Sequence, residues 1–163
     1  MQKKFRTVGV GGTFDELHKG HRALLIKAFD VGEHVMIGVS SDEFVKKMSK
    51  PHQTAPYEER TRELKDFLKD HGILQRAEIF PISDAYGGVL LSKEPIEALV
   101  VSKETEPIAL KINEKRREIG INPLEIVVIG MVPSENHKAI STTRIRIGEI
   151  DREGRMLEKP HGS

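Results

Sequence analysis

The sequence predicts an α/β domain built on a doubly wound parallel sheet with helices on both faces. Short apolar runs alternate with stretches in which apolar residues recur at helical spacing. Each run is apolar along nearly its whole length, as in a strand covered on both faces, rather than apolar at every second position. Parallel strands joined through helices follow from that alternation. The five expected strands are residues 7–10, 34–39, 78–82, 98–102 and 125–129.

Helix signals fill the intervals between these runs. The first helix is expected over residues 20–31. The second begins at Pro56, carries a buried stripe of Leu64, Phe67 and Leu68, and ends at Gly72. The third opens at residues 104–107, presents Ile108, Ile112 and Ile119 on its inner face, and stops at Gly120. A last short helix is expected within residues 140–146.

Size and composition exclude several classes of protein. A chain of 163 residues without repeats or a linker is one domain, which we place at residues 1–155 with a frayed tail at 156–163. Cysteine is absent, which excludes disulfides, thiolate catalysis and cysteine zinc sites. The formal net charge of +1 gives no sign of a nucleic-acid partner. No apolar run approaches membrane length and the first residues do not read as a signal peptide, so the expected location is the cytoplasm. The oligomeric state is left open.

Residues 11–21, Gly-Gly-Thr-Phe-Asp-Glu-Leu-His-Lys-Gly-His, connect the first strand to the first helix. Glycines let backbone approach a ligand closely, and a helix N-terminus favours an anion. His18 and His21 are three residues apart at the helix start, so both rings can face one ligand. We interpret the stretch as a phosphate site. The alternative is an ordinary turn with two surface or core histidines.

A second hydroxyl-rich stretch lies near the C-terminus. Ser141, Thr142 and Thr143 stand at an expected helix start, with Arg144 and Arg146 behind them. Hydroxyls and N–H groups in that position suit phosphate oxygens. An ordinary Ser/Thr N-cap is the alternative.

The polar segments that follow strands form the remaining candidates. Residues 40–50 are longer than a usual crossover loop and carry Lys46, Lys47 and Lys50. Asp84, Tyr86, Gly87 and Gly88 follow the third strand. In a doubly wound sheet the ligand binds beyond the carboxyl ends of the strands, so all these loops should border one crevice. The lysines then neutralise an anionic substrate, or they are only a solvated charge run.

These residues carry a resemblance. Thr13-Phe14-Asp15 followed by His18-Lys19-Gly20-His21 resembles the H-x-G-H signature of the nucleotidyltransferase superfamily, and residues 140–146 resemble its I-S-S-T-x-x-R motif, with Thr142 in place of the second Ser. The superfamily implies a Rossmann-like domain with strand order 3-2-1-4-5. Lys47-Met48-Ser49-Lys50 also spells a string known from class I tRNA synthetases. In those enzymes the string follows the last strand, so we treat it as chance.

Residues 84–87, 101–105, Asn113 and Arg116 are similar to the archaeal and eukaryotic type of phosphopantetheine adenylyltransferase. The bacterial type carries two arginines near positions 102 and 105, where this chain has Ser102 and Thr105. Their roles then fall to other residues, for which Lys47, Lys50 and Arg144 are the candidates.

The resemblance implies adenylyl transfer from ATP to 4′-phosphopantetheine, with Mg²⁺ bound through the ATP phosphates and no protein metal ligand assigned. It implies three catalytic residues, which are Thr13, His18 and His21. Contacts to ATP are expected from Phe14, Lys103, Glu104, Thr105, Asn113, Ser141, Thr142, Thr143 and Arg146. Contacts to the acceptor are expected from Thr13, Lys47 and Lys50. Two alternatives stay open: a nucleotidyltransferase with another phosphorylated acceptor, or a nucleotide sensor without turnover.

Overall fold

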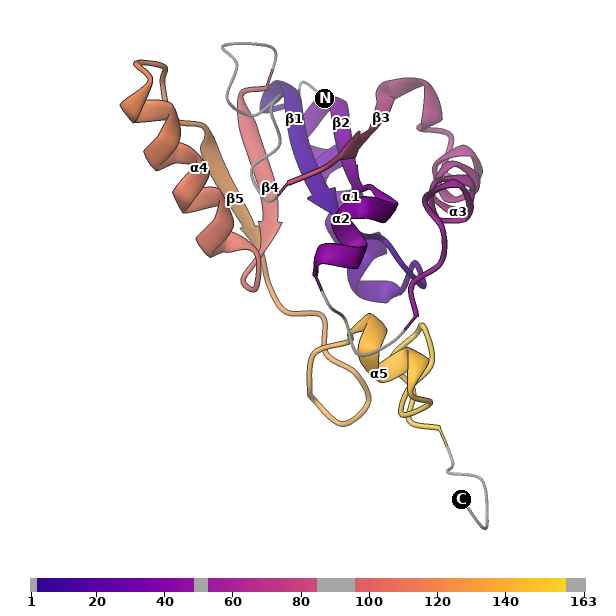
Figure 1. Ribbon diagram of the computed structural model, residues 1–163. Coiled ribbons are helices and arrows are strands. Elements are labelled where there is room, and N and C mark those ends of the chain that lie inside the picture. Colours follow the sequence, from indigo (N-terminus) through magenta and orange to yellow (C-terminus); the bar gives the residue numbers. More distant parts are fainter. Residues whose placement is uncertain (1–2, 49–52, 85–95, 158–163) are drawn as a thin grey trace.

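The computed structural model describes residues 3–48, 53–84 and 96–157. Five parallel strands form one sheet in the order β3-β2-β1-β4-β5 (Figure 1). The predicted α/β class, the strand order and the placement of helices on both faces are therefore confirmed. The strands are β1 (Phe5–Gly12), β2 (Gly32–Ser40), β3 (Ala77–Ile82), β4 (Ala98–Ser102) and β5 (Glu125–Ile129).

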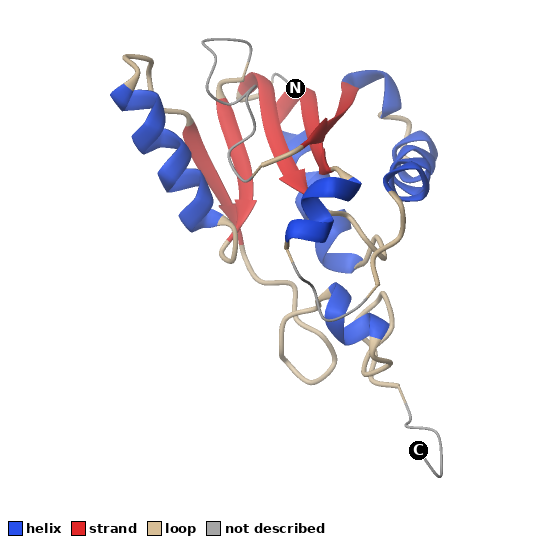
Figure 2. Ribbon diagram, in the orientation of Figure 1, coloured by secondary structure: helices blue, strands red, loops and turns tan. Residues whose placement is uncertain are grey.

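Helices cover the sheet on two sides (Figure 2). On one side α1 (Lys19–Val31) and α3 (Tyr57–Asp70) bury Leu25, Phe29, Leu64 and Leu68 against β1 and β2. On the other side α4 (Glu106–Glu118) buries Ala109 and Ile112 against Met36 of β2 and Leu99 of β4. A 3-10 turn (Leu74–Arg76) leads into β3. None of the helices in the described ranges has the length and apolar run needed to cross a membrane.

The expected inner face of α4 is wrong in part. Ile108 is 39% exposed and Ile119 is 59% exposed, whereas Ile112 is buried. The buried positions are Ala109, Ile112, Asn113 and Arg116. The spacing of the isoleucines predicts the wrong face because two of the buried positions, Asn113 and Arg116, are polar. Asn113 donates from Nδ2 to the Leu124 carbonyl (2.8 Å) and accepts at Oδ1 from its N–H (2.7 Å), so it ties α4 to the start of β5.

The lysine segment after β2 is a helix rather than a loop. Ser41 caps α2 (Asp42–Lys47) by accepting the N–H of Phe44 at 3.1 Å. Asp42 and Glu43 occupy its first turn, and Lys46 and Lys47 its last turn, as the helix dipole favours. Lys50, Tyr86, Gly87 and Gly88 lie outside the described residues.

The final elements extend below the carboxyl edge of the sheet, where β1 also ends (Figure 1). The short helix α5 (Thr142–Arg146) confirms the helix expected in residues 140–146. Beyond it, Met156 and Leu157 were expected to fray but are bonded. Met156 donates its N–H to Glu135 Oε2 (2.7 Å), and Leu157 donates to the carbonyl of Glu149 (3.0 Å).

Candidate active site

The loop between β1 and α1 has a strained backbone. Phe14 and Glu16 adopt positive φ angles of 53° and 58°, a region that costs a non-glycine residue free energy unless its surroundings enforce it. Between them, Asp15 is 1% exposed and accepts the N–H of Ala55 at Oδ1 (3.2 Å). The Phe14 ring is also buried, with its centroid 5.4 Å from that of His21. Tertiary contacts thus fix the loop conformation.

The two histidines form a stacked pair at the start of α1. Their ring centroids are 3.6 Å apart and the planes differ by 17°. His18 Nδ1 accepts the N–H groups of Gly20 (3.1 Å) and His21 (3.3 Å), while His21 Nδ1 accepts the N–H of His18 (3.3 Å). Because both Nδ1 atoms are acceptors, either ring in its neutral form carries its proton on Nε2.

Burial, and then the charges of Arg22 and Arg152, lower the pKa of His18 to about 4. The ring is therefore neutral at pH 7, and its Nε2–H can donate a hydrogen bond without an ionic charge. Gly20 makes this arrangement possible, because a Cβ there would lie 2.9 Å from His18 Cε1. The H-x-G-H spacing thus has a steric reason in this chain.

The N–H groups at the start of α1 are not free to bind an anion, so this part of the phosphate-site interpretation of residues 11–21 is wrong. Gly20 and His21 donate to the His18 ring, and Arg22 donates to the His18 carbonyl (3.0 Å). Lys19 donates to the carbonyl of Arg152 (2.8 Å). The protein itself satisfies the first turn of α1, so the Nε2–H of the neutral His18 ring, rather than the helix N–H groups, is the donor that this helix start can offer to a phosphate.

The second motif lies against the first one. Thr142 Oγ1 donates to the carbonyl of Asp15 at 2.9 Å, across 127 residues of sequence. Ser141 caps α5 by accepting the N–H of Arg144 (3.2 Å), so the N-cap alternative describes its hydroxyl correctly. The Thr143 side chain is half-buried, and its hydroxyl makes no hydrogen bond within the described residues. Of the three hydroxyls, that of Thr143 is the one without a protein partner among these residues.

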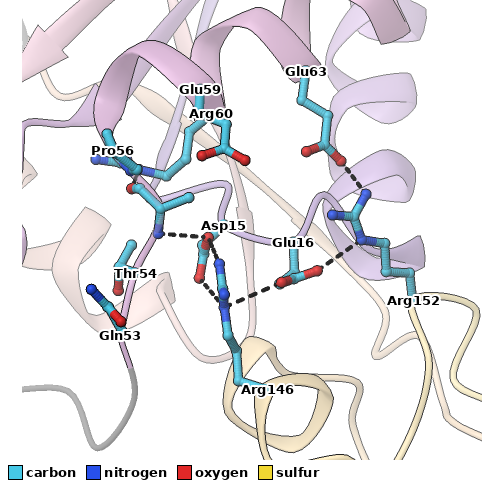
Figure 3. Close-up of a pocket in the computed structure, with 11 residues that line it drawn as sticks. Asp15, Glu16, Gln53, Thr54, Pro56, Glu59, Arg60, Glu63, Arg146 and Arg152 are labelled. Carbon is cyan, nitrogen blue, oxygen red and sulfur yellow. Dashed lines mark hydrogen bonds and ion pairs between the residues drawn. The ribbon is translucent and has the colours of Figure 1, made fainter.

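Arg146 joins the two motifs by charge. Its guanidinium donates to Asp15 twice, from Nη2 to Oδ1 (2.7 Å) and from Nε to Oδ2 (3.0 Å), and its Nε also lies 3.2 Å from Glu16 Oε1. The hydrogen bond to Asp15 raises the pKa of Arg146. Arg152 continues the chain of ion pairs, with Nε 2.9 Å from Glu16 Oε2 and Nη1 paired with Glu63 (Figure 3).

These pairs line a pocket of about 220 Å³ between the β1–α1 loop, the start of α3 and α5 (Figure 3). Asp15 and Glu16 face Arg146 there, so their carboxylates are already neutralised by the protein. Within the described ranges no three His, Asp or Glu side chains are grouped as a metal site would require.

Arg60 is a further residue of this region that the sequence reading did not single out. It is 2% exposed and donates from Nε to the Ala55 carbonyl (2.8 Å) and from Nη1 to the Thr13 carbonyl (2.8 Å). Its Nη2 pairs with Asp42 Oδ1 of α2 at 3.1 Å. One helical turn separates Arg60 from Leu64, so the sequence does contain a signal: an arginine on the buried stripe of α3.

The remaining predicted residues lie in three different settings. Lys103 and Glu104 are exposed in the β4–α4 turn, which Thr105 closes by accepting the Ser102 N–H at Oγ1 (3.1 Å). Asn113 is 5% exposed, and its bonds to Leu124 do not favour the expected contact with a nucleotide. Lys47 is exposed at the end of α2.

Arg144, a candidate for substrate binding, is engaged within the protein instead. Its Nη1 donates to Ser134 Oγ and to the Ala139 carbonyl, both at 2.9 Å. Its Nη2 donates to Asn136 Oδ1 at 3.0 Å and pairs with Glu149 at the same distance. These contacts fold the segment before α5 around Arg144, which is a structural role.

Known proteins are similar to this chain in sequence and fold. Residues 10–148 match the model of the cytidylyltransferase-like family. A crystal structure of a protein with unknown function from Archaeoglobus fulgidus is 35% identical, covers 76% of this chain and 88% of its own, and superposes with a TM-score of 0.67. The chain therefore belongs to the cytidylyltransferase-like family.

Two curated relatives carry the same name. A protein of Methanopyrus kandleri named phosphopantetheine adenylyltransferase is 48% identical over 148 residues, which cover 91% of this chain and 92% of the relative. A second protein of that name, from Methanothermobacter thermautotrophicus, is 44% identical over 163 residues and covers 100% of this chain and 96% of its own.

Proposed function

We propose that this protein transfers the adenylyl group of ATP to 4′-phosphopantetheine, forming dephospho-coenzyme A and pyrophosphate in the cytoplasm. The observation that carries the proposal is the contact of the two sequence motifs at Asp15. Thr142 binds its carbonyl and Arg146 its carboxylate, so a single ligand can reach both motifs. The full-length similarity to proteins named for this reaction supplies the acceptor.

The reaction needs no activated side chain, because the nucleophile is already a phosphate. It needs that phosphate to be aligned with the α-phosphorus of ATP. An oxygen of the phosphopantetheine phosphate attacks the α-phosphorus, and the bond from that phosphorus to the pyrophosphate oxygen breaks. The protein has to hold the attacking and leaving oxygens in line and stabilise the charge that develops. The neutral Nε2–H donor of His18, with the His21 ring stacked on it beside a rigid loop, suits that task.

Each residue has a part in this proposal. Thr13 and the Phe14 N–H orient the attacking phosphate and the α-phosphate. His21 donates to the α-phosphate in the transition state, and His18 donates to a neighbouring phosphate. Thr143 holds the outer phosphates through its hydroxyl.

The other contacts are assigned by position. Ser141, Thr142 and Arg146 shape the triphosphate site, and their protein contacts keep it rigid. Lys103, Glu104 and Thr105, in the turn after β4, contact the adenosine. Lys47 and Lys50 bind the acceptor. Mg²⁺ would be held by the ATP phosphates and would neutralise part of their charge.

A pyrophosphate-release assay with ATP and 4′-phosphopantetheine tests the function, with mass spectrometry to identify dephospho-coenzyme A. CTP in place of ATP, and other phosphorylated acceptors in place of phosphopantetheine, test the alternatives within nucleotidyl transfer. His21→Ala is the negative control. Nucleotide binding without any product would favour the sensor alternative and contradict the proposal.

A further inference from the structure

Residues 150–157 form a C-terminal turn beyond the end of the matched family region at residue 148. Asp151 Oδ1 accepts the N–H groups of Glu153 (2.9 Å) and Arg155 (2.8 Å), and the Gly154 N–H donates to the Asp151 carbonyl (3.0 Å). Gly154 has a φ of +81°, and a Cβ there would lie 2.7 Å from Ile140 Cδ1. The turn is therefore a specified structure that packs closely on the segment before α5.

This C-terminal turn contacts the start of α1. The Lys19 N–H donates to the Arg152 carbonyl at 2.8 Å, and Arg22 pairs with Glu153. Lys19 directly follows His18, and Arg22 directly follows His21. Any shift of the C-terminal turn would thus be passed to the two stacked rings through one hydrogen bond and one ion pair.

The Arg152 side chain makes a second connection, to the loop that precedes α1. Its Nε lies 2.9 Å from Glu16 Oε2, and its Nη1 pairs with Glu63 of α3 (Figure 3). Glu16 has a φ of 58°, so this contact helps to hold a residue in a strained conformation. Arg152 thereby links three segments: the β1–α1 loop, α1 and α3.

We propose that Arg152 is a positioning residue for adenylyl transfer, which holds the β1–α1 loop and the stacked histidines in their reactive geometry. This inference rests on the proposed function of the same site. Arg152 acts through Glu16 and the first turn of α1, and needs no contact with either substrate. Its backbone carbonyl and its side chain contribute separately, and only the side chain is removed by substitution.

Steady-state kinetics of Arg152→Ala test the proposal, with Arg152→Lys and Arg155→Ala as comparisons. Arg155→Ala removes a charge of the same sign from the same turn. The Arg155 side chain is 72% exposed and pairs with Asp151 instead of Glu16. Since small misplacements of catalytic groups can cost up to about a hundredfold, we expect Arg152→Ala to lower kcat by about tenfold or more. The KM for ATP should change much less, because no ligand contact is lost.

Arg152→Lys should recover part of the loss, because one ammonium can replace one of the two ion pairs but not both. Arg155→Ala should keep the wild-type kcat. Equal kcat values for Arg152→Ala and Arg155→Ala would overturn the proposal.

A measurement without substrate separates this proposal from the proposed function. The charges that face His18 are Arg22 on α1 and Arg152 on the C-terminal turn, with His21 stacked on the ring. In Arg152→Ala the pKa of His18, followed by NMR, should rise because one cation is lost. Amide exchange of Lys19 should accelerate, because the C-terminal turn that carries its acceptor loses the side-chain contacts with Glu16 and Glu63. If the wild type makes no dephospho-coenzyme A, the proposed function fails. If both NMR measurements are unchanged in Arg152→Ala, the positioning role fails.

Discussion

Arg146 binds the carboxylate of Asp15 through two hydrogen bonds, of 2.7 and 3.0 Å, although the residues are 131 positions apart. The Asp15 side chain is 1% exposed and that of Arg146 is 28% exposed. A carboxylate buried this deeply is costly unless it is paired. The pair therefore fixes α5 against the β1–α1 loop, which brings the two halves of the candidate site together.

Loss of that guanidinium should destabilise the fold. Removing one partner of a buried ion pair leaves an uncompensated charge, so Arg146→Ala should lower the free energy of unfolding by about 3 kcal/mol. Urea denaturation measures this. Arg155→Ala breaks an exposed pair within one turn and should cost less than about 1 kcal/mol. Similar losses in the two variants would contradict the role given to the Asp15 pair.

His18 has two separable roles, as the N-cap of α1 and as a ring donor. Asn is a strong N-cap whose side-chain oxygen can accept the N–H groups of Gly20 and His21, but it lacks the Nε2–H. His18→Asn should therefore keep most of the stability while kcat falls, by about a hundredfold for one preorganised donor. His18→Ala should lose both, with an additional cost of about 1 kcal/mol in unfolding. Thermal unfolding and kinetics of the two variants check this, and equal stability would show that the ring is no cap.

The depressed pKa of His18 makes folding stability depend on pH. The folded pKa is about 4 and the ordinary value is 6.5, so between these pH values the unfolded chain binds a proton that the native protein does not. Stability should fall as pH is lowered through that window, by on the order of 3 kcal/mol from this residue. The difference between wild type and His18→Asn in urea denaturation isolates the effect. Parallel curves from pH 7 to 4 would mean that His18 is not buried as a neutral ring.

The fold followed from the sequence because its signals are local. Residues 98–102 and 125–129 are apolar at all positions but Ser102 and Glu125, and the structure has strands at these bounds. The buried face of α4 is harder to predict. Asn113 can be buried there because the backbone N–H and carbonyl of Leu124 satisfy its side-chain amide. A partner of that kind is a property of the tertiary structure.

The candidate site could be predicted as a set of residues but not as a set of contacts. The H-x-G-H spacing correctly predicts two histidine rings at the start of α1. It does not predict the hydrogen bond from the Lys19 N–H to the Arg152 carbonyl, because that bond joins residues far apart in the sequence. The contacts of Arg60 and Arg152 cannot be predicted from the sequence. Their roles depend on the carbonyl of Thr13 and the carboxylate of Glu16, which only the folded loop presents.

The lysines of α2 should act on the acceptor rather than on ATP. Lys46 and Lys47 are exposed at the end of α2, whose Asp42 is tied to the β1–α1 loop through Arg60. Replacing Lys46, Lys47 and Lys50 with Ala should raise the KM for phosphopantetheine by about tenfold, from roughly 0.5 kcal/mol per exposed charge. Kinetics with each substrate varied in turn check this, and Lys65→Ala with Lys69→Ala on α3 is the control. A selective loss of ATP affinity would instead assign these lysines to the triphosphate.

The two motifs should couple energetically if they bind one nucleotide. Thr142 already joins them structurally through the Asp15 carbonyl, so a test has to use groups that make no such contact. The Nε2–H of His18 and the hydroxyl of Thr143 meet that condition, because neither has a recorded protein hydrogen bond within the described residues. His18→Asn preserves the cap, and Thr143→Ala leaves the Ser141 cap of α5 intact.

In a double-mutant cycle of His18→Asn and Thr143→Ala, each single variant removes one donor to the same triphosphate. Once one donor is gone, the phosphates can shift and the second contact loses part of its value, so the effects on kcat/KM should not add. We expect an interaction energy of about 0.5 kcal/mol or more. Pairing Thr143→Ala with Lys65→Ala on α3 is the control and should be additive. Strict additivity of the His18 and Thr143 variants would mean that they contact different ligands, and the triphosphate site assigned to α5 would then be wrong.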